Sequence, residues 1–106
     1  MYANVRTYRV APGDIDRVMH AIDESFVPEL SAQPGFVAYQ AIDAGGGTLV
    51  TVTTFREESA AANSAGLAKD FIARELSDVE LERTNMFNGE VAVSKAAQEM
   101  LEPSHA

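Results

Sequence analysis

The chain has 106 residues, 46% of them apolar, and its 16 acidic and 8 basic side chains give a formal net charge of −8. This length and composition fit one globular domain, and an acidic excess without any cluster of Lys and Arg disfavours nucleic-acid and membrane-surface partners. The absence of cysteine excludes disulfides, thiolate metal sites and a cysteine nucleophile, and without an apolar leader or a stretch of about 18 apolar residues we expect a cytoplasmic protein.

Residues 2–10 are rich in Tyr, Val and Thr and end at Ala11-Pro12-Gly13, which predicts a strand followed by a turn. From Asp14, the expected N-cap, apolar residues recur at intervals of three and four and predict an amphipathic helix. These residues are Ile15, Val18, Met19, Ile22, Phe26 and Leu30. Pro28 cannot donate a backbone hydrogen bond and predicts a kink in the last turns, and Pro34-Gly35 ends the helix.

A hairpin is expected next. Residues 36–44 and 48–56 are both rich in β-forming residues, and Gly45-Gly46-Gly47 between them supplies the positive φ angles of a tight reversal. Ser59 is then the expected N-cap of a second helix, which ends near Asp78. The helical spacing of this segment is carried by Leu67, Ala68, Phe71, Ile72 and Leu76.

The last strand is predicted over residues 85–95, where apolar and polar side chains alternate and Gly89 marks a bulge. Residues 96–106 form a short tail, which leaves one domain over residues 1–95. The order strand, helix, strand, strand, helix, strand predicts the α+β ferredoxin-like βαββαβ fold, a four-stranded antiparallel sheet with both helices on one face. The other face must be solvated, covered by a partner or used as a pocket wall.

Three short segments resemble a known family: Pro34-Gly35-Phe36, the glycine turn, and the Thr-Phe-Arg-Glu-Glu-Ser stretch of residues 54–59. Together they resemble the antibiotic biosynthesis monooxygenase superfamily of dimeric α/β barrels, over residues 2–95. The resemblance implies a homodimer in which two sheets pack through their helix-free sides. It also implies a small apolar cavity, either between sheet and helices or opening to the barrel. Some members of this superfamily oxidise polycyclic phenols without metal or flavin, and others degrade heme.

The heme-degrading members match this chain poorly. They share an axial histidine on the second helix, whereas residues 60–78 contain none. Asn4 lies near a position where those members carry asparagine, but the turn at Pro12-Gly13 aligns Arg6 there more naturally. The family's enzymes often carry a tryptophan where this chain has Phe55. Without cysteine, an axial histidine or a phosphate-cradling glycine loop, we expect no cofactor: no heme, no flavin and no tightly bound metal.

Strand parity places Asn4, Arg6 and Tyr8 on one face of the first strand. The opposite face carries Ala3, Val5 and Thr7. We expect the second set to pack against the helices and the first to project into the barrel, where a phenol, a guanidinium and an amide would orient a phenolic or carbonyl ligand. In the alternative interpretation, Arg6 pairs with an acidic residue across the dimer interface and Tyr8 only fills space.

In the third strand, Thr51, Thr53 and Phe55 share one parity and are expected to line the cavity. A three-residue glycine loop places Tyr39 opposite Thr53 and Val37 opposite Phe55, whereas a four-residue loop reverses this pairing. The predicted ligand-binding residues are therefore Asn4, Arg6, Tyr8, Tyr39, Thr51, Thr53 and Phe55. Simple cross-strand packing is the structural alternative for the third-strand residues.

His20 lies four residues from both Asp16 and Glu24 on the polar face of the first helix. A metal site needs further ligands in fixed geometry, so this arrangement indicates a solvated surface histidine.

Two functions remain open. The first is a cofactor-independent monooxygenase of a small aromatic or enolisable metabolite, in which Arg6, Asn4 or Tyr8 stabilises developing negative charge. The second is a non-catalytic dimeric barrel that binds a small hydrophobic metabolite or serves as a structural module. In both cases we expect a homodimer, because the helix-free face would expose Phe55, Tyr8 and Val10.

Overall fold

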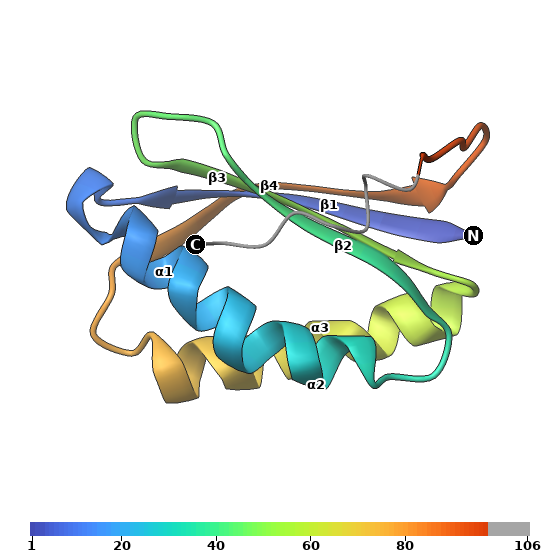
Figure 1. Ribbon diagram of the computed structural model, residues 1–106, viewed down its shortest axis with the longest axis horizontal. Coiled ribbons are helices and arrows are strands. Elements are labelled where there is room, and N and C mark those ends of the chain that lie inside the picture. Colours follow the sequence, from blue (N-terminus) through green and yellow to red (C-terminus); the bar gives the residue numbers. More distant parts are fainter. Residues whose placement is uncertain (98–106) are drawn as a thin grey trace.

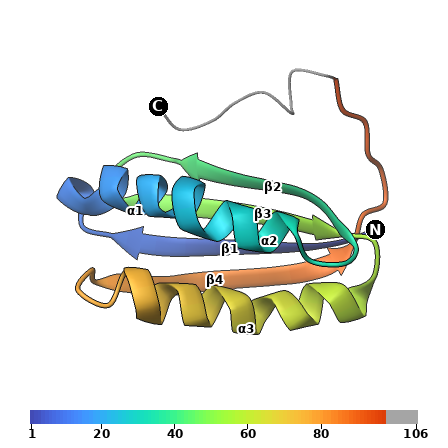
Figure 2. The ribbon, with the colours of Figure 1, turned by 60° about the horizontal axis from the view of Figure 1, so that its bottom comes forward.

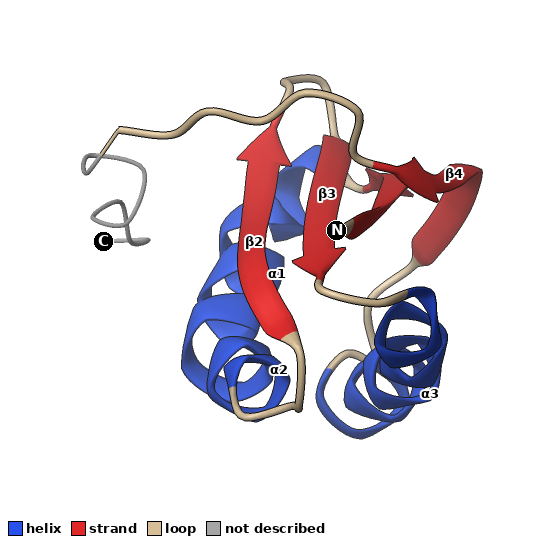
Figure 3. Ribbon diagram, turned by 90° about the vertical axis from the view of Figure 1, so that its right-hand side faces the viewer, coloured by secondary structure: helices blue, strands red, loops and turns tan. Residues whose placement is uncertain are grey.

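The computed structural model describes residues 1–97. Its elements are β1 (Tyr2–Val10), a 3-10 turn η1 (Pro12–Asp14), α1 (Ile15–Ala21), a π-helical turn η2 (Ile22–Phe26), α2 (Val27–Ser31), β2 (Phe36–Asp43), β3 (Thr48–Phe55), α3 (Glu58–Glu75) and β4 (Leu81–Glu90). The strands form one antiparallel sheet in the order β2-β3-β1-β4. All the helices lie beneath one face of this sheet (Figures 1 and 3). The predicted α+β ferredoxin-like fold is confirmed.

The first helical segment is continuous but changes its hydrogen-bond register. In Figure 2, α1 and α2 follow one another along the sheet. Between them the backbone N–H of Val27 donates to the carbonyl of Ile22, five residues earlier, as in a π turn. Pro28 then falls in the first turn of α2, where a missing N–H costs little. The expected irregularity at Pro28 is therefore found in the turn that precedes it.

The hairpin between β2 and β3 has the expected three-glycine loop. The N–H of Ala44 donates to the carbonyl of Thr48 at 2.9 Å, and the N–H of Thr48 donates to the carbonyl of Gly45 at 3.1 Å. In the resulting register Tyr39 lies opposite Thr53. The pairing predicted from a three-residue loop is thus confirmed.

The beginning of β2 departs from the prediction. The register shifts between Phe36 and Ala38, so that Phe36, and not Val37, lies opposite Phe55. Such a bulge accommodates one extra residue in β2. The preceding Gly35, at a φ of 81°, accepts a hydrogen bond from the N–H of Arg56 at 2.8 Å and holds this end of the hairpin together.

The bounds of two elements were predicted wrongly. The second helix, α3, begins at Glu58 with an extended Glu57 as its N-cap, so Ser59 lies inside the first turn, and it ends at Glu75 rather than near Asp78. The last strand, β4, covers Leu81–Glu90 instead of residues 85–95. Hydrogen bonding along β1 selects this segment, and alternation of side chains alone did not reveal it. Its bulge is opposite Thr7 and Tyr8, not at Gly89.

The core lies between the sheet and the helices. Its buried apolar residues are Val10, Val18, Met19, Ile22, Phe26, Leu30, Leu49, Phe55, Ala61, Phe71, Leu76 and Val79. Val10 and Phe55 belong to this core and Tyr8 packs against it, so the expectation that they occupy the helix-free face is wrong. Within residues 1–97, no helix combines the length and hydrophobicity needed to cross a membrane.

Candidate functional site

A cavity of about 40 Å³ lies between the sheet and the helices. Its polar wall consists of Arg6, Tyr8, Tyr39, Thr51 and Thr53 from the three strands β1, β2 and β3. The apolar remainder comes from α1, η2, α3, the C-cap residue Leu76 and the two strand ends at Leu49 and Leu81. One face of the cavity can therefore hold a polar group of a ligand while the other packs against its apolar part.

Arg6 is the charged group of this wall. The residue is only 8% exposed, and its Nε is buried without a hydrogen-bond partner. None of the carboxylates in residues 1–97 forms an ion pair with it. A buried cation without an ion-pair partner is costly in free energy. The guanidinium loses hydrogen bonds to water on burial, and the protein does not replace them all. An anionic group in the cavity would offset this cost.

Tyr39 supplies a neutral hydrogen-bond donor beside that cation. Its ring meets the ring of Phe26 edge-on, with centroids 5.6 Å apart. Burial raises the pKa of the Tyr39 phenol well above its ordinary value; nearby Tyr8 raises that pKa further, and Arg6 partly opposes the shift. The phenol is therefore protonated throughout the neutral range and can donate a hydrogen bond to an oxyanion.

Thr51 and Thr53 complete the polar wall. Both are almost fully buried, and the register places Thr51 beside Arg6 and Thr53 between Asn4 and Tyr39. Their hydroxyl groups can each donate or accept, so they suit either a carbonyl or an ionised oxygen. The wall thus contains one cation and several adaptable donors around a small volume.

The cavity contains no proton acceptor of the usual kind. No Asp, Glu or His is among the residues that line it, and residues 1–97 contain no cluster of such groups able to hold a metal ion. His20 is on the surface as predicted, 62% exposed, with its Nε2 3.2 Å from a carboxylate oxygen of Glu24. A ligand that reacts as an anion must therefore ionise without help from a carboxylate or imidazole of this wall.

The expected direction of the first strand's polar face was wrong. Asn4, Arg6 and Tyr8 face the helices and not the helix-free side, because their partners Thr51 and Thr53 share a face with the core residue Phe55. Side chains paired across neighbouring strands lie on the same face of a sheet. This placement also separates Arg6 from any interface formed through the helix-free side.

Two of the predicted ligand-binding residues lie away from the cavity. Asn4 donates from Nδ2 to the carbonyl of Ala61 at 3.4 Å and lines a neighbouring surface groove. Phe55 is fully buried and packs edge-on against Phe36, with ring centroids 6.1 Å apart. Arg6, Tyr8, Tyr39, Thr51 and Thr53 are brought together as one wall.

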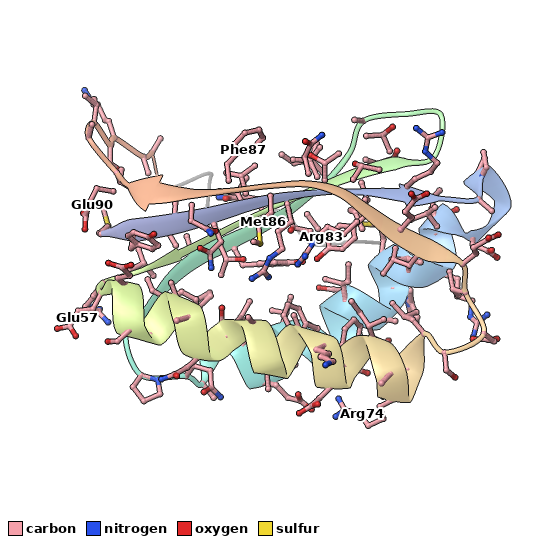
Figure 4. The ribbon with its side chains drawn as sticks, turned by 180° about the vertical axis from the view of Figure 1, so that it is seen from behind. Glu57, Arg74, Arg83, Met86, Phe87 and Glu90 are labelled. Atoms are coloured by element: carbon pink, nitrogen blue, oxygen red, sulfur yellow. The ribbon has the colours of Figure 1, made fainter. Side chains whose placement is uncertain are left out.

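A groove of about 470 Å³ between α3 and β4 leads to this wall. It shares Arg6, Tyr8, Ala68, Ile72 and Leu81 with the cavity and is open to solvent. Sequence reasoning missed it, since the groove depends on the distance between two segments that are far apart along the chain. In Figure 4, Arg83 and Met86 lie on the side of β4 that faces α3, and Phe87 points the other way.

Comparison with known proteins found solved structures only. No family model matches the chain, and no curated protein matches it. A dimeric ferredoxin-like protein from an uncultured marine organism is 12% identical, with a TM-score of 0.72, over 91% of this chain and 98% of that one. A protein described as an antibiotic biosynthesis monooxygenase is 19% identical, with a TM-score of 0.61, over 89% and 100% of the two chains. SnoaB from Streptomyces nogalater, described as a cofactor-independent oxygenase, is 16% identical, with a TM-score of 0.61, over 88% and 94%.

Proposed function

The chain has the fold of the antibiotic biosynthesis monooxygenase proteins, and from this premise we propose that it is a cofactor-independent monooxygenase of a small aromatic or enolisable metabolite. The observation that carries the proposal is Arg6 in the cavity wall, a buried residue whose Nε has no hydrogen-bond partner and which forms no ion pair within residues 1–97. Such a group stabilises an enolate or phenolate more strongly than its neutral parent, because the cation attracts the anion and this attraction is stronger beside buried residues than in bulk water.

The chemistry requires an electron-rich anion. Loss of a proton from the substrate gives a carbanion or phenolate that can pass electrons to dioxygen. The overall reaction converts a CH₂ group and O₂ into a C=O group and water, so the substrate supplies all the electrons and no external reductant is needed. Arg6 holds the anion, and the protonated phenol of Tyr39 donates to its oxygen.

The wall also restricts the kind of substrate. Since no carboxylate or imidazole lines the cavity, the proton lost by the substrate passes to solvent. The positive charge of Arg6 favours this ionisation, because it lowers the pKa of the substrate. The substrate is therefore an acidic phenol or a 1,3-dicarbonyl compound. With a volume of about 40 Å³, the cavity takes only the reacting edge of the ring, and the rest occupies the groove between α3 and β4.

Oxygen uptake tests this proposal. We expect the protein to consume O₂ with at least one member of a panel of hydroxylated naphthalenes, anthrones and 1,3-diketones. Arg6→Ala should lower this rate at least about 100-fold, since it removes the charge that stabilises the anion. The matched control is Arg9→Ala, which removes the same charge from an exposed position of the same strand. Equal rates for the two variants would contradict the role of Arg6.

A non-catalytic small-molecule-binding barrel is the second candidate. The observation that favours it is the absence of an Asp, Glu or His in the cavity wall, together with the small cavity volume. In that case the same compounds bind, and Arg6→Ala weakens their binding, but O₂ is not consumed. Titration calorimetry beside the oxygen electrode separates the two functions.

We also propose that two copies of the chain form a homodimer through the helix-free face. That face exposes Phe87 at 66% and Ile42 at 46%, and a soluble protein gains by covering such side chains. The neighbour from an uncultured marine organism that is described as a dimeric ferredoxin-like protein supports dimerisation. Sedimentation should give a dimer for the wild type and a monomer for Phe87→Asp. Met86→Asp, on the opposite face of β4, is the control and should remain dimeric; a monomeric wild type would contradict the proposal.

A further inference from the structure

The groove between α3 and β4 is strongly basic in an acidic protein. Arg6, Lys69 and Arg83 line it, which is three of the eight basic side chains of the chain, whereas the net charge is −8. No Asp or Glu is among its lining residues. The lining of the groove therefore carries a local positive charge in a molecule whose net charge is negative.

Two of these cations lack an anionic partner. Neither Lys69 nor Arg83 forms an ion pair with a carboxylate of residues 1–97, and Arg83 makes only a contact of 3.7 Å from Nη1 to the sulfur of Met86. Outside the groove, by contrast, Arg17 and Arg74 are held by carboxylates at 2.7 and 2.8 Å. Lys69 and Arg83 are both exposed and available at the mouth of the groove.

Small apolar side chains make up part of the groove between the cations. On the helix side, Ala65 and Ala68 line the groove together with Ile72, and Leu81 lines it from β4. Alanine at these positions keeps α3 from filling the gap to β4, so a flat ring can lie there. Arg83 extends from β4 toward α3 across this opening (Figure 4).

We propose that the ligand of this site is an aromatic carboxylate that spans the groove and the cavity. Its carboxylate lies between Lys69 and Arg83, its ring lies on Ala65 and Ala68, and its phenol or enol reaches Arg6. The inference rests on the proposed function for the orientation of the reacting group, and it adds the substrate's second anionic group. Two flexible cations at an open mouth suit a carboxylate that remains partly solvated.

A pair of fluorescent probes tests this subsite without turnover. We measure binding of a hydroxynaphthoate and of the naphthol that lacks its carboxylate, under nitrogen and at low salt. The wild type should bind the hydroxynaphthoate about tenfold more tightly than the naphthol, and this advantage should shrink as salt screens the exposed charges. Lys69→Gln and Arg83→Gln should each weaken hydroxynaphthoate binding about threefold to fivefold and leave naphthol binding unchanged.

The controls separate the subsite from the proposed reaction. Arg9→Gln makes the same change of net charge on an exposed position outside the groove and should leave both affinities unchanged. Equal wild-type affinities for the two probes, or an equal effect of Arg9→Gln, would overturn the carboxylate subsite. Binding with the expected pattern but without O₂ uptake in air would support the subsite and contradict the monooxygenase. Failure of both probes to bind would overturn the subsite.

Discussion

The side chain of Asn4 in β1 donates a hydrogen bond from Nδ2 to the backbone carbonyl of Ala61 in α3, at 3.4 Å. The same carbonyl accepts a second hydrogen bond from the hydroxyl of Ser64, at 2.6 Å. All three residues are buried. This contact ties the first turns of α3 to β1, the inner strand that also carries Arg6.

Replacement of Asn4 should cost stability. We expect Asn4→Ala to lower the free energy of unfolding by about 1 kcal/mol, because one buried hydrogen bond is lost while Ser64 still satisfies the carbonyl. Urea denaturation measures the change. Asn88→Ala is the matched control, since Asn88 lies opposite Asn4 in β4 but is exposed. Equal costs for the two variants would show that the contact with Ala61 contributes little.

Replacement of Arg6 by an apolar side chain should have the opposite effect on stability. We expect Arg6→Met to raise the free energy of unfolding by about 1–2 kcal/mol, because it removes a buried cation without a partner and keeps an unbranched side chain of similar length. The same variant should lose affinity for anionic ligands. A thermal midpoint of Arg6→Met below that of the wild type would contradict this expectation, because it would indicate that Arg6 stabilises the fold in the absence of a ligand.

Gly47 should tolerate no side chain. It adopts a φ of 82°, and a Cβ there would collide with the carbonyl of Val10, whose N–H donates to the Gly47 carbonyl at 2.7 Å. We expect Gly47→Ala to cost about 2–3 kcal/mol in the free energy of unfolding. Gly46→Ala has a similar backbone strain, at a φ of 62°, but no atom near its Cβ, and should cost only about 1 kcal/mol. Similar losses at both positions would contradict the predicted collision.

Alkaline pH should destabilise the protein through Tyr39. Burial raises the pKa of this phenol in the folded state, so the unfolded chain releases its proton first as the pH rises. The stabilisation is fully present below the ordinary tyrosine pKa, about 10, and is lost progressively as the pH rises toward the folded-state pKa. Urea denaturation across this pH range should show that the free energy of unfolding declines less in Tyr39→Phe than in the wild type. A decline of the same size in the variant would contradict this assignment.

Local patterns in the sequence determined a large part of the fold. The first strand was predicted with its observed bounds because β-forming residues stop at Ala11-Pro12-Gly13. The glycine loop left two pairings open, because loop length fixes the register of a hairpin, and the structure has the one expected for a three-residue loop, Tyr39 with Thr53. The side chains of Arg6 and Tyr8 were correctly assigned to one face, because alternation along a strand is a property of its own backbone.

The tertiary structure alone decided which way that face points and what lies opposite it. The direction in which Arg6 points is determined by the pairing of β1 with β3. Leu49 and Phe55 of β3 are buried against the helices, and the pairing places Arg6 on the same side of the sheet. The bounds of β4 were decided by its pairing with β1. Lys69 of α3 and Arg83 of β4 line the same groove because the tertiary structure brings these two elements close together. These relations join segments that are distant along the chain, and the free energy that selects them comes from burying the whole core, which no local pattern records.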